Sequence, residues 1–125
     1  MRLGDLSVGF VHSLVDAVLS YGQDPTPLLE QYALDAARLA EAGARLSIPR
    51  YMRLGHGAIQ LTGDPALGLR MGRLSRLSQA GLAGVTAAQA PTVREAARCL
   101  TRFEALYGSC LLYTSDAADE GLGVD

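Results

Sequence analysis

Apolar residues recur at intervals of three and four along most of the chain, which is the spacing of one helix face. The pattern is clearest over residues 8–20, 49–61 and 93–107, so we predict a helix over each of these ranges. It predicts a mainly α fold, a bundle of five to seven short helices around one core. Weaker signals predict further helices over 26–32, 35–42, from Pro65 onward and over 79–90, with residues 44–48 extended before Pro49.

The central stretch, residues 47–72, has the best-defined helix boundaries. Pro49 and Pro65 each fall in a predicted first turn, where the missing N–H of proline leaves no hydrogen bond unmade. Asp64 can accept from free first-turn N–H groups. We therefore predict two consecutive helices here, and the inward stripe of the first consists of Tyr51, Leu54, Ala58 and Leu61.

Polar residues mark other helix starts. Asp5 or Ser7 is predicted to cap the first helix, and Asp24 the second. Thr92 and Glu95 form a capping box, the strongest start signal in the chain. The apolar face predicted for the helix that follows consists of Val93, Ala96, Ala97, Leu100, Phe103 and Tyr107.

Composition supports a helical core. Apolar residues make up 49% of the 125 residues and aromatic residues only 6%, with no Trp. Ala, Gly and Leu dominate, whereas a sheet would need more β-branched and aromatic residues. This apolar content also excludes a disordered chain.

Charge is distributed unevenly. All 11 basic residues are arginines that lie between Arg2 and Arg102. Residues 1–109 also contain nine acids, which leaves a net charge of +2, and four acids after residue 110 bring the whole chain to −2. A body so close to neutral argues against nucleic-acid binding by this part of the chain. The apparent helix-turn-helix at residues 83–94 is rejected as well, since Pro91 and the residues before it separate the two helices.

The chemistry-bearing residue types form no catalytic or metal-binding pattern. Cys99 and Cys110 provide neither a disulfide framework nor metal-ligand spacing, and phosphate-binding loops, nucleophile elbows and acid pairs are missing from the sequence. We predict no enzyme, no metal and no cofactor. No apolar run reaches the length of a membrane span, about 18 residues, and no signal peptide is recognisable, so the predicted location is cytoplasmic.

Three segments carry a family resemblance. They are Ile48-Pro49, residues 62–70 (TGDPALGLR) and residues 90–96 (APTVREA). In this order and at these separations they resemble the N-terminal, arabinose-binding type of effector-sensing domain in AraC/XylS-type transcription regulators. The similarity runs from about Leu14 to Tyr107.

The resemblance implies a function in one-component transcription regulation. The chain would be the truncated helical half of an α+β sensor domain, in a parent protein that binds a small polar metabolite. DNA would be bound only through a C-terminal domain missing from this chain, and interdomain or homodimer contacts are expected. The alternative is a helical protein–protein interaction module without a ligand.

Ligand-binding residues are not specified by these motifs. The candidates are Tyr51, His56 and Arg70. Glycines flank His56 within a predicted helix, for which close packing is favoured over ligand access. Arg70, Arg73 and Arg76 recur every three residues, which favours a solvated helix flank over an anion contact.

The end of the chain differs from the rest. Residues 110–125 (CLLYTSDAADEGLGVD) lack arginine and resemble a translated sequencing-library adapter. We therefore predict a native domain over residues 1–109 and a non-native tail over 110–125. A native strand over 110–114 is the rival interpretation, but it does not account for residues 115–125.

Overall fold

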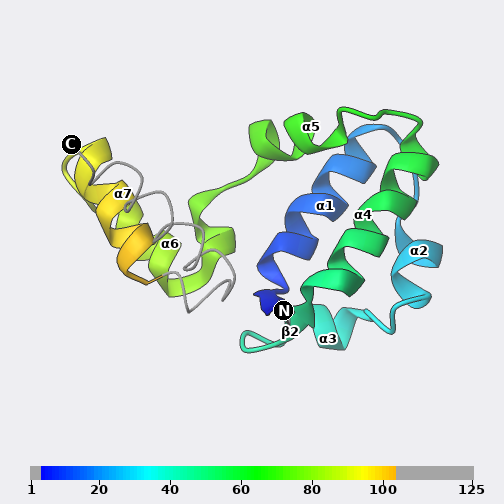
Figure 1. The fold of residues 1–125 in the computed structure, drawn as a ribbon, viewed down its shortest axis with the longest axis horizontal. Coiled ribbons are helices and arrows are strands. Elements are labelled where there is room, and N and C mark those ends of the chain that lie inside the picture. Colours follow the sequence, from blue (N-terminus) through cyan, green and yellow to red (C-terminus); the bar gives the residue numbers. More distant parts are fainter. Residues whose placement is uncertain (1–3, 104–125) are drawn as a thin grey trace, which may run out of the picture.

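The computed structural model describes residues 4–103 and confirms the mainly α fold class. Figure 1 shows two parts. The body is built around the neighbouring helices α1 and α4, and a helical hairpin formed by α6 and α7 lies to one side of it. In chain order the elements are β1 (Asp5–Ser7), α1 (Gly9–Ser20), α2 (Thr26–Glu30), α3 (Ala36–Ala40), β2 (Arg45–Ser47), α4 (Ile48–Thr62), α5 (Leu67–Leu74), the 3-10 helix η1 (Leu77–Ala80), α6 (Gly81–Ala88) and α7 (Val93–Arg102).

The body has one apolar core. Helix α1 lies against α4 and α5, and α2 covers the outer side of α4. The four largest fully buried side chains lie at its centre: Val11 and Val18 of α1, Leu54 of α4 and Leu67 of α5. Burial of each such side chain stabilises the fold by about 1.5–3 kcal/mol. The remaining buried residues of this core are Leu14, Ala17, Leu29, Leu34, Leu46 and Ala58.

A two-stranded antiparallel sheet ties the start of the chain to the start of α4. Leu6 is opposite Leu46, and Asp5 is opposite Ser47. The extended segment before Pro49 is thus confirmed. The prediction that Asp5 caps the first helix is wrong, because Asp5 lies in β1 and accepts a 2.6 Å hydrogen bond from Arg45 Nε. Ser7 lies in the same strand, and its Oγ accepts from the Gly9 N–H just inside α1.

The predicted start and end of α4 are confirmed to within one residue. Ser47 precedes the helix, proline occupies its first turn, and Gly63 ends it in the left-handed region at φ +71°. Leu54 and Ala58 are buried and Tyr51 is half-buried, as the stripe predicts. Leu61 is exposed, contrary to prediction, because Ile59 takes the inward position in the last turn.

Helix α5 begins two residues later than predicted. Asp64 accepts a 2.8 Å hydrogen bond from the Ala66 N–H in a turn that holds Pro65, and the helix starts at Leu67. It ends at Leu74, so the prediction that Arg76 lies on the same helix flank as Arg70 is wrong.

Aspartates precede the two shortest helices: Asp35 is the N-cap of α3, whereas Asp24 lies one residue before Pro25, the N-cap of α2. Asp24 accepts a hydrogen bond from Thr26 N at 3.0 Å, and Asp35 accepts one from Arg38 N at 2.7 Å. Both helices end before the predicted limits of 32 and 42. Five residues each is a single turn or slightly more, so tertiary packing must hold them.

The hairpin departs most from prediction. The helix expected over 79–90 is split at Gly81, whose φ of +66° separates η1 from α6. Thr92 accepts from the Glu95 N–H at 3.2 Å, which confirms the predicted cap. The apolar face predicted for α7 is not buried, since Val93 is 88% exposed and Phe103 is exposed too. The helix ends at Arg102; Tyr107 lies outside the described residues, as does the predicted tail.

Candidate functional site

A groove beside α4 brings together two of the three predicted ligand-binding residues. It is a cavity of about 320 Å³ between α4, α5 and α1. Tyr51 and His56 lie in its wall. The other lining residues are Leu14, Met52, Gly55, Ile59, Leu67, Gly68 and Met71. This arrangement of an apolar wall with a few polar groups is typical of small-molecule sites.

Two glycines keep the groove open. A Cβ added at Gly55 or at Gly68 would meet no heavy atom within 4 Å. Each glycine costs its helix about 1 kcal/mol relative to alanine. The space beside both is therefore unfilled by the protein, although alanine would occupy part of it without a clash.

Gly57 faces elsewhere and serves a different purpose. A Cβ at this position would lie 2.6 Å from Cδ1 of Leu28, on the side of α4 that α2 covers. The close packing predicted for the two glycines around His56 is thus confirmed at Gly57 and wrong at Gly55.

Tyr51 is held by α1. Its ring meets the edge of the Phe10 ring at a centroid distance of 6.4 Å, and its hydroxyl donates to the Phe10 carbonyl oxygen at 3.4 Å. Burial raises the pKa of Tyr51 to about 12. The phenol is therefore protonated at neutral pH, and because its proton is donated to Phe10, its oxygen can accept a hydrogen bond beside the groove.

His56 lies on the rim. It is exposed, and it borders both this groove and a second depression that reaches Tyr32 and Arg53. Among residues 4–103 its ring has no hydrogen-bond partner. An imidazole in this position can donate to or accept from a bound molecule.

Arg70 lies apart from the groove, in a polar clasp that joins the end of α1 to the start of α5. Its guanidinium stacks on the Tyr21 ring at 4.7 Å, and its Nε donates to Ser20 Oγ at 2.9 Å. The Tyr21 hydroxyl donates to Asp64. That hydrogen bond lowers the pKa of Asp64 and raises the pKa of Tyr21. Arg70 is thus engaged within the protein.

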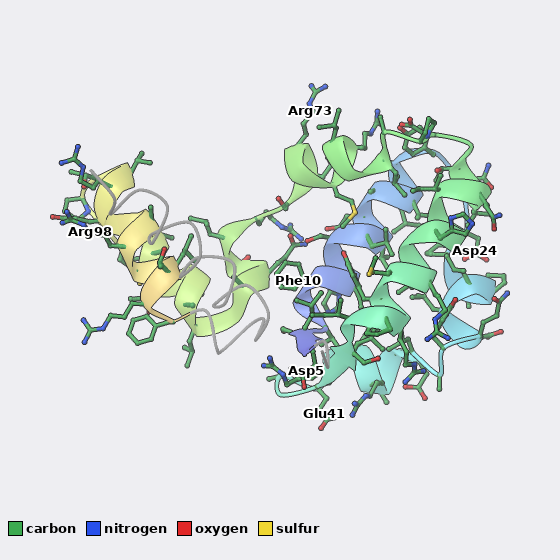
Figure 2. All side chains as sticks on the ribbon, viewed as in Figure 1. Asp5, Phe10, Asp24, Glu41, Arg73 and Arg98 are labelled. Carbon is green, nitrogen blue, oxygen red and sulfur yellow. The ribbon has the colours of Figure 1, made fainter. Side chains whose placement is uncertain are left out.

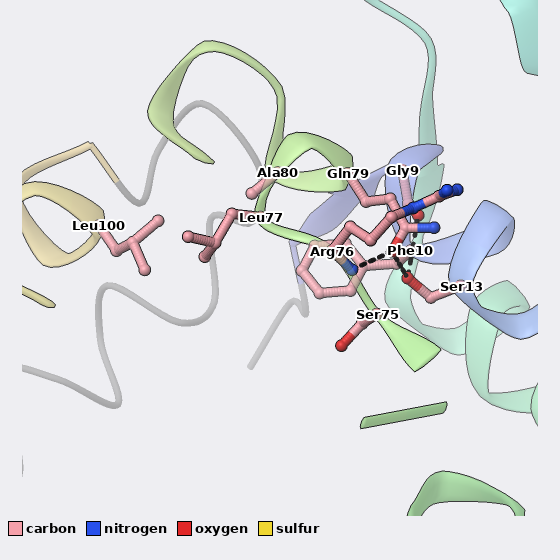
Figure 3. Close-up of a pocket in the computed structure, with 9 residues that line it drawn as sticks. All are labelled: Gly9, Phe10, Ser13, Ser75, Arg76, Leu77, Gln79, Ala80 and Leu100. Atoms are coloured by element: carbon pink, nitrogen blue, oxygen red, sulfur yellow. Dashed lines mark hydrogen bonds between the residues drawn. The ribbon is translucent and has the colours of Figure 1, made fainter. Parts of the chain in front are cut away.

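A second cavity, of about 340 Å³, lies where the hairpin meets α1 (Figure 3). Phe10, Leu77 and Leu100 supply its apolar wall. On its polar side the Gln79 amide oxygen accepts from Ser13 Oγ at 2.8 Å and from Arg76 N at 2.9 Å. The Gln79 side-chain nitrogen donates to Asp16 at 3.0 Å.

We call this contact between the hairpin and α1 the joint. The sequence does not predict it, because its hydrogen-bond partners lie more than sixty residues apart and leave no local pattern. Gly9 is the one local sign of close packing: a Cβ there would lie 1.8 Å from the Gln79 carbonyl oxygen. The backbone of η1 therefore touches α1 directly.

Residues 4–103 contain no group of three or more His, Cys, Asp or Glu side chains placed to hold a metal ion. No helix within that range is long and apolar enough to cross a membrane.

A family model for the N-terminal arabinose-binding domain of AraC transcription regulators matches residues 22–124, and the chain belongs to this family. Such domains are sensing modules of regulators and not enzymes. The matched range includes residues 110–124, for which a non-native origin stays a prediction. No curated protein matches the chain.

Proposed function

We propose that this chain is the effector-sensing part of a cytoplasmic one-component transcription regulator, and that the α4–α5 groove receives the effector. The carrying observation is the open space beside Gly55 and Gly68, in a wall that also holds Tyr51 and His56. Family membership supports a small-molecule effector.

The groove lining narrows the kind of effector. Two methionines, Met52 and Met71, adapt to irregular apolar shapes. Polar contacts are offered only at one side, by the Tyr51 oxygen as an acceptor and by the His56 ring as a donor or acceptor. An effector with an apolar face and one carboxylate or hydroxyl suits this wall, which narrows the small polar metabolite expected from the resemblance.

The test is a protein-observed NMR screen of the 125-residue chain against small aliphatic and aromatic carboxylates. Binders should shift the amide signals of Gly55, His56 and Gly68. The variants G55L and G68L, which fill the groove, should abolish these shifts. G72L is the matched control, because Gly72 lies on α5 with open space around it but outside the groove. Shifts that survive both groove variants would place the effector elsewhere.

The alternative is an interaction module without a ligand. It draws support from the exposed apolar residues of the hairpin, among them Leu82 and Val85. Under this alternative no carboxylate shifts the groove signals, while a protein partner shifts those of α6.

Signal transfer in the parent protein needs a DNA-binding domain and contacts between domains or copies. We propose that both are encoded beyond Ser109, and that residues 110–125 are adapter sequence. Amplifying and resequencing the source locus without adapters tests this directly. Codons for residues 110–125 in the genomic DNA would overturn it, whereas two helix-turn-helix motifs downstream would support it.

A further inference from the structure

Helix α7 carries three arginines on one side. Arg94, Arg98 and Arg102 are spaced four residues apart, so they follow one another along the same helix face. They cover about 12 Å of helix axis, since each residue adds about 1.5 Å. All three are exposed. We call this set the α7 arginine ridge.

The ridge lies on the outer side of α7, and Arg98 and Arg102 also border a depression next to Thr86 of α6. The opposite side of α7 packs on α6, where the Cys99 thiol donates to the Ala83 carbonyl oxygen at 3.9 Å and Leu100 is half-buried. Figure 2 shows Arg98 projecting outward at the end of the molecule remote from Asp24. Within residues 4–103 none of the three arginines forms an ion pair with an acid.

The hairpin is more basic than the rest of the described chain. Residues 77–103 contain three arginines, all of them in the ridge, and one acid, Glu95, a net charge of +2, whereas residues 4–76 contain seven arginines and seven acids. The Arg102 guanidinium also lies over the Phe103 ring, 5.6 Å from its centroid. The near-neutral total of residues 1–109 conceals this separation.

Small residues lie between the arginines. Ala97 and Thr101 form the floor of a shallow trough that the three guanidinium groups border. A tetrahedral anion can approach such a floor closely, and guanidinium groups bind phosphate oxygens in pairs. A protein partner would be expected to meet a large apolar or aromatic anchor at this point, and the trough has none.

We propose that the α7 arginine ridge binds backbone phosphates of duplex DNA. One strand carries a phosphate every 3.4 Å or so of helix axis, so 12 Å of ridge spans three to four phosphates. The contact carries no sequence information. It rests on the proposed function, in which a separate domain holds the protein at a promoter and raises the local concentration of DNA near α7. It adds a DNA contact by the sensor itself.

The test is fluorescence anisotropy of the 125-residue chain with a labelled duplex of arbitrary sequence, between 50 and 200 mM NaCl. Three phosphate contacts predict a slope of log K against log salt of about −2.7, an affinity loss of about 40-fold over this range. The variant R94Q/R98Q/R102Q should bind at least tenfold more weakly at 50 mM and lose the slope. The lysine variant R94K/R98K/R102K should retain the slope because the charges remain.

The matched control is R38Q/R50Q/R53Q, which removes three exposed arginines from α3 and α4. Its affinity should stay within twofold of the unmodified chain, with circular dichroism confirming that all variants fold. Equal losses in both triple variants would mean that net charge alone is read, and would overturn the proposal. So would salt-independent binding, or equal displacement of the duplex by polyglutamate. No effector is present, so the outcome is independent of the groove experiment.

Discussion

The body and the hairpin of this domain are held together by different means. In the body, α1, α4 and α5 bury Val11, Leu54 and Leu67 completely. In the hairpin, α7 buries no residue, and α6 buries only Ala83, Gly84 and Ala87. The hairpin is instead docked by backbone contact at Gly9 and by the side chain of Gln79.

The interactions that stabilise the fold are therefore not the ones that fix where the hairpin lies. Burying large side chains stabilises the body, whereas a few polar contacts and the missing Cβ atom of Gly9 fix where the hairpin lies. Such a joint is easier to open than a core, because its hydrogen bonds can be exchanged for bonds to water at a small net loss. The junction cavity beside Gln79 is therefore the place where the two parts are expected to move relative to each other.

The largest expected effect comes from shortening a leucine in each part. Leu54→Ala removes a fully buried side chain and should lower the free energy of unfolding by about 2–5 kcal/mol. Leu82→Ala removes one that is 78% exposed and should change it by no more than about 0.5 kcal/mol. Urea unfolding followed by circular dichroism measures both. Similar losses in the two variants would mean that the hairpin has a core of its own.

A smaller effect is expected from Gly9→Ala, which attacks the joint. The new Cβ would lie 1.8 Å from the Gln79 carbonyl oxygen, so η1 must move away from α1. We expect a destabilisation of about 1–3 kcal/mol, the usual range for overpacking. Hydrogen exchange should accelerate in α6 and α7 while α4 keeps its protection. Gly72→Ala, with open space around it, is the control; unchanged exchange in α6 would contradict the docking described here.

The body could be predicted from sequence better than the hairpin, for a physical reason. The boundaries of α4 follow from Pro49 and Gly63, and its inward face follows from the spacing of Leu54 and Ala58, all of them local signals. In the hairpin, the predicted helix is interrupted at Gly81, whose backbone has a positive φ, and nothing in the surrounding Gly/Ala-rich sequence predicts this interruption. Whether Val93 is buried depends on which elements pack against α7, and the spacing of apolar residues along the sequence does not predict that.

The candidate site was predictable only in part. Tyr51 and His56 lie five residues apart on one helix, and both border the groove. Arg70 was a candidate because a guanidinium suits anion binding. Its actual partners, Tyr21 and Ser20, lie about fifty residues away in sequence and could not be predicted. The α7 arginine ridge, in contrast, could be predicted from the four-residue spacing of its members. The net charge of the whole chain conceals it.

Acid should weaken the clasp that joins α1 to α5 in the body. Hydrogen bonding from Tyr21 lowers the pKa of Asp64, so this contribution to stability is present above the unfolded pKa, near 3.9, and is lost as the pH falls through the folded value. Tyr21→Phe should raise the pKa of Asp64, which an NMR titration of its carboxyl carbon measures. An unchanged Asp64 pKa would show that the clasp is not formed in solution.

The last comparison makes the same glycine-to-alanine substitution in each of the two parts, and the effect in the body is the smallest expected here. Gly55→Ala places a methyl group in the open groove, and it should stabilise α4 by about 0.5–1 kcal/mol because alanine is the better helix former. Gly84→Ala in the hairpin should destabilise, since its Cβ would lie 1.5 Å from the Leu77 carbonyl oxygen. Thermal unfolding of the two variants shows whether each substitution stabilises or destabilises the protein.

If the absence of a side chain at Gly55 keeps the groove open, Gly55→Ala should also weaken binding of any carboxylate found by the NMR screen. Gly72→Ala should gain the same helix stability and leave binding unchanged. A Gly55→Ala chain that is more stable and binds equally well would show that the effector does not reach this part of the groove.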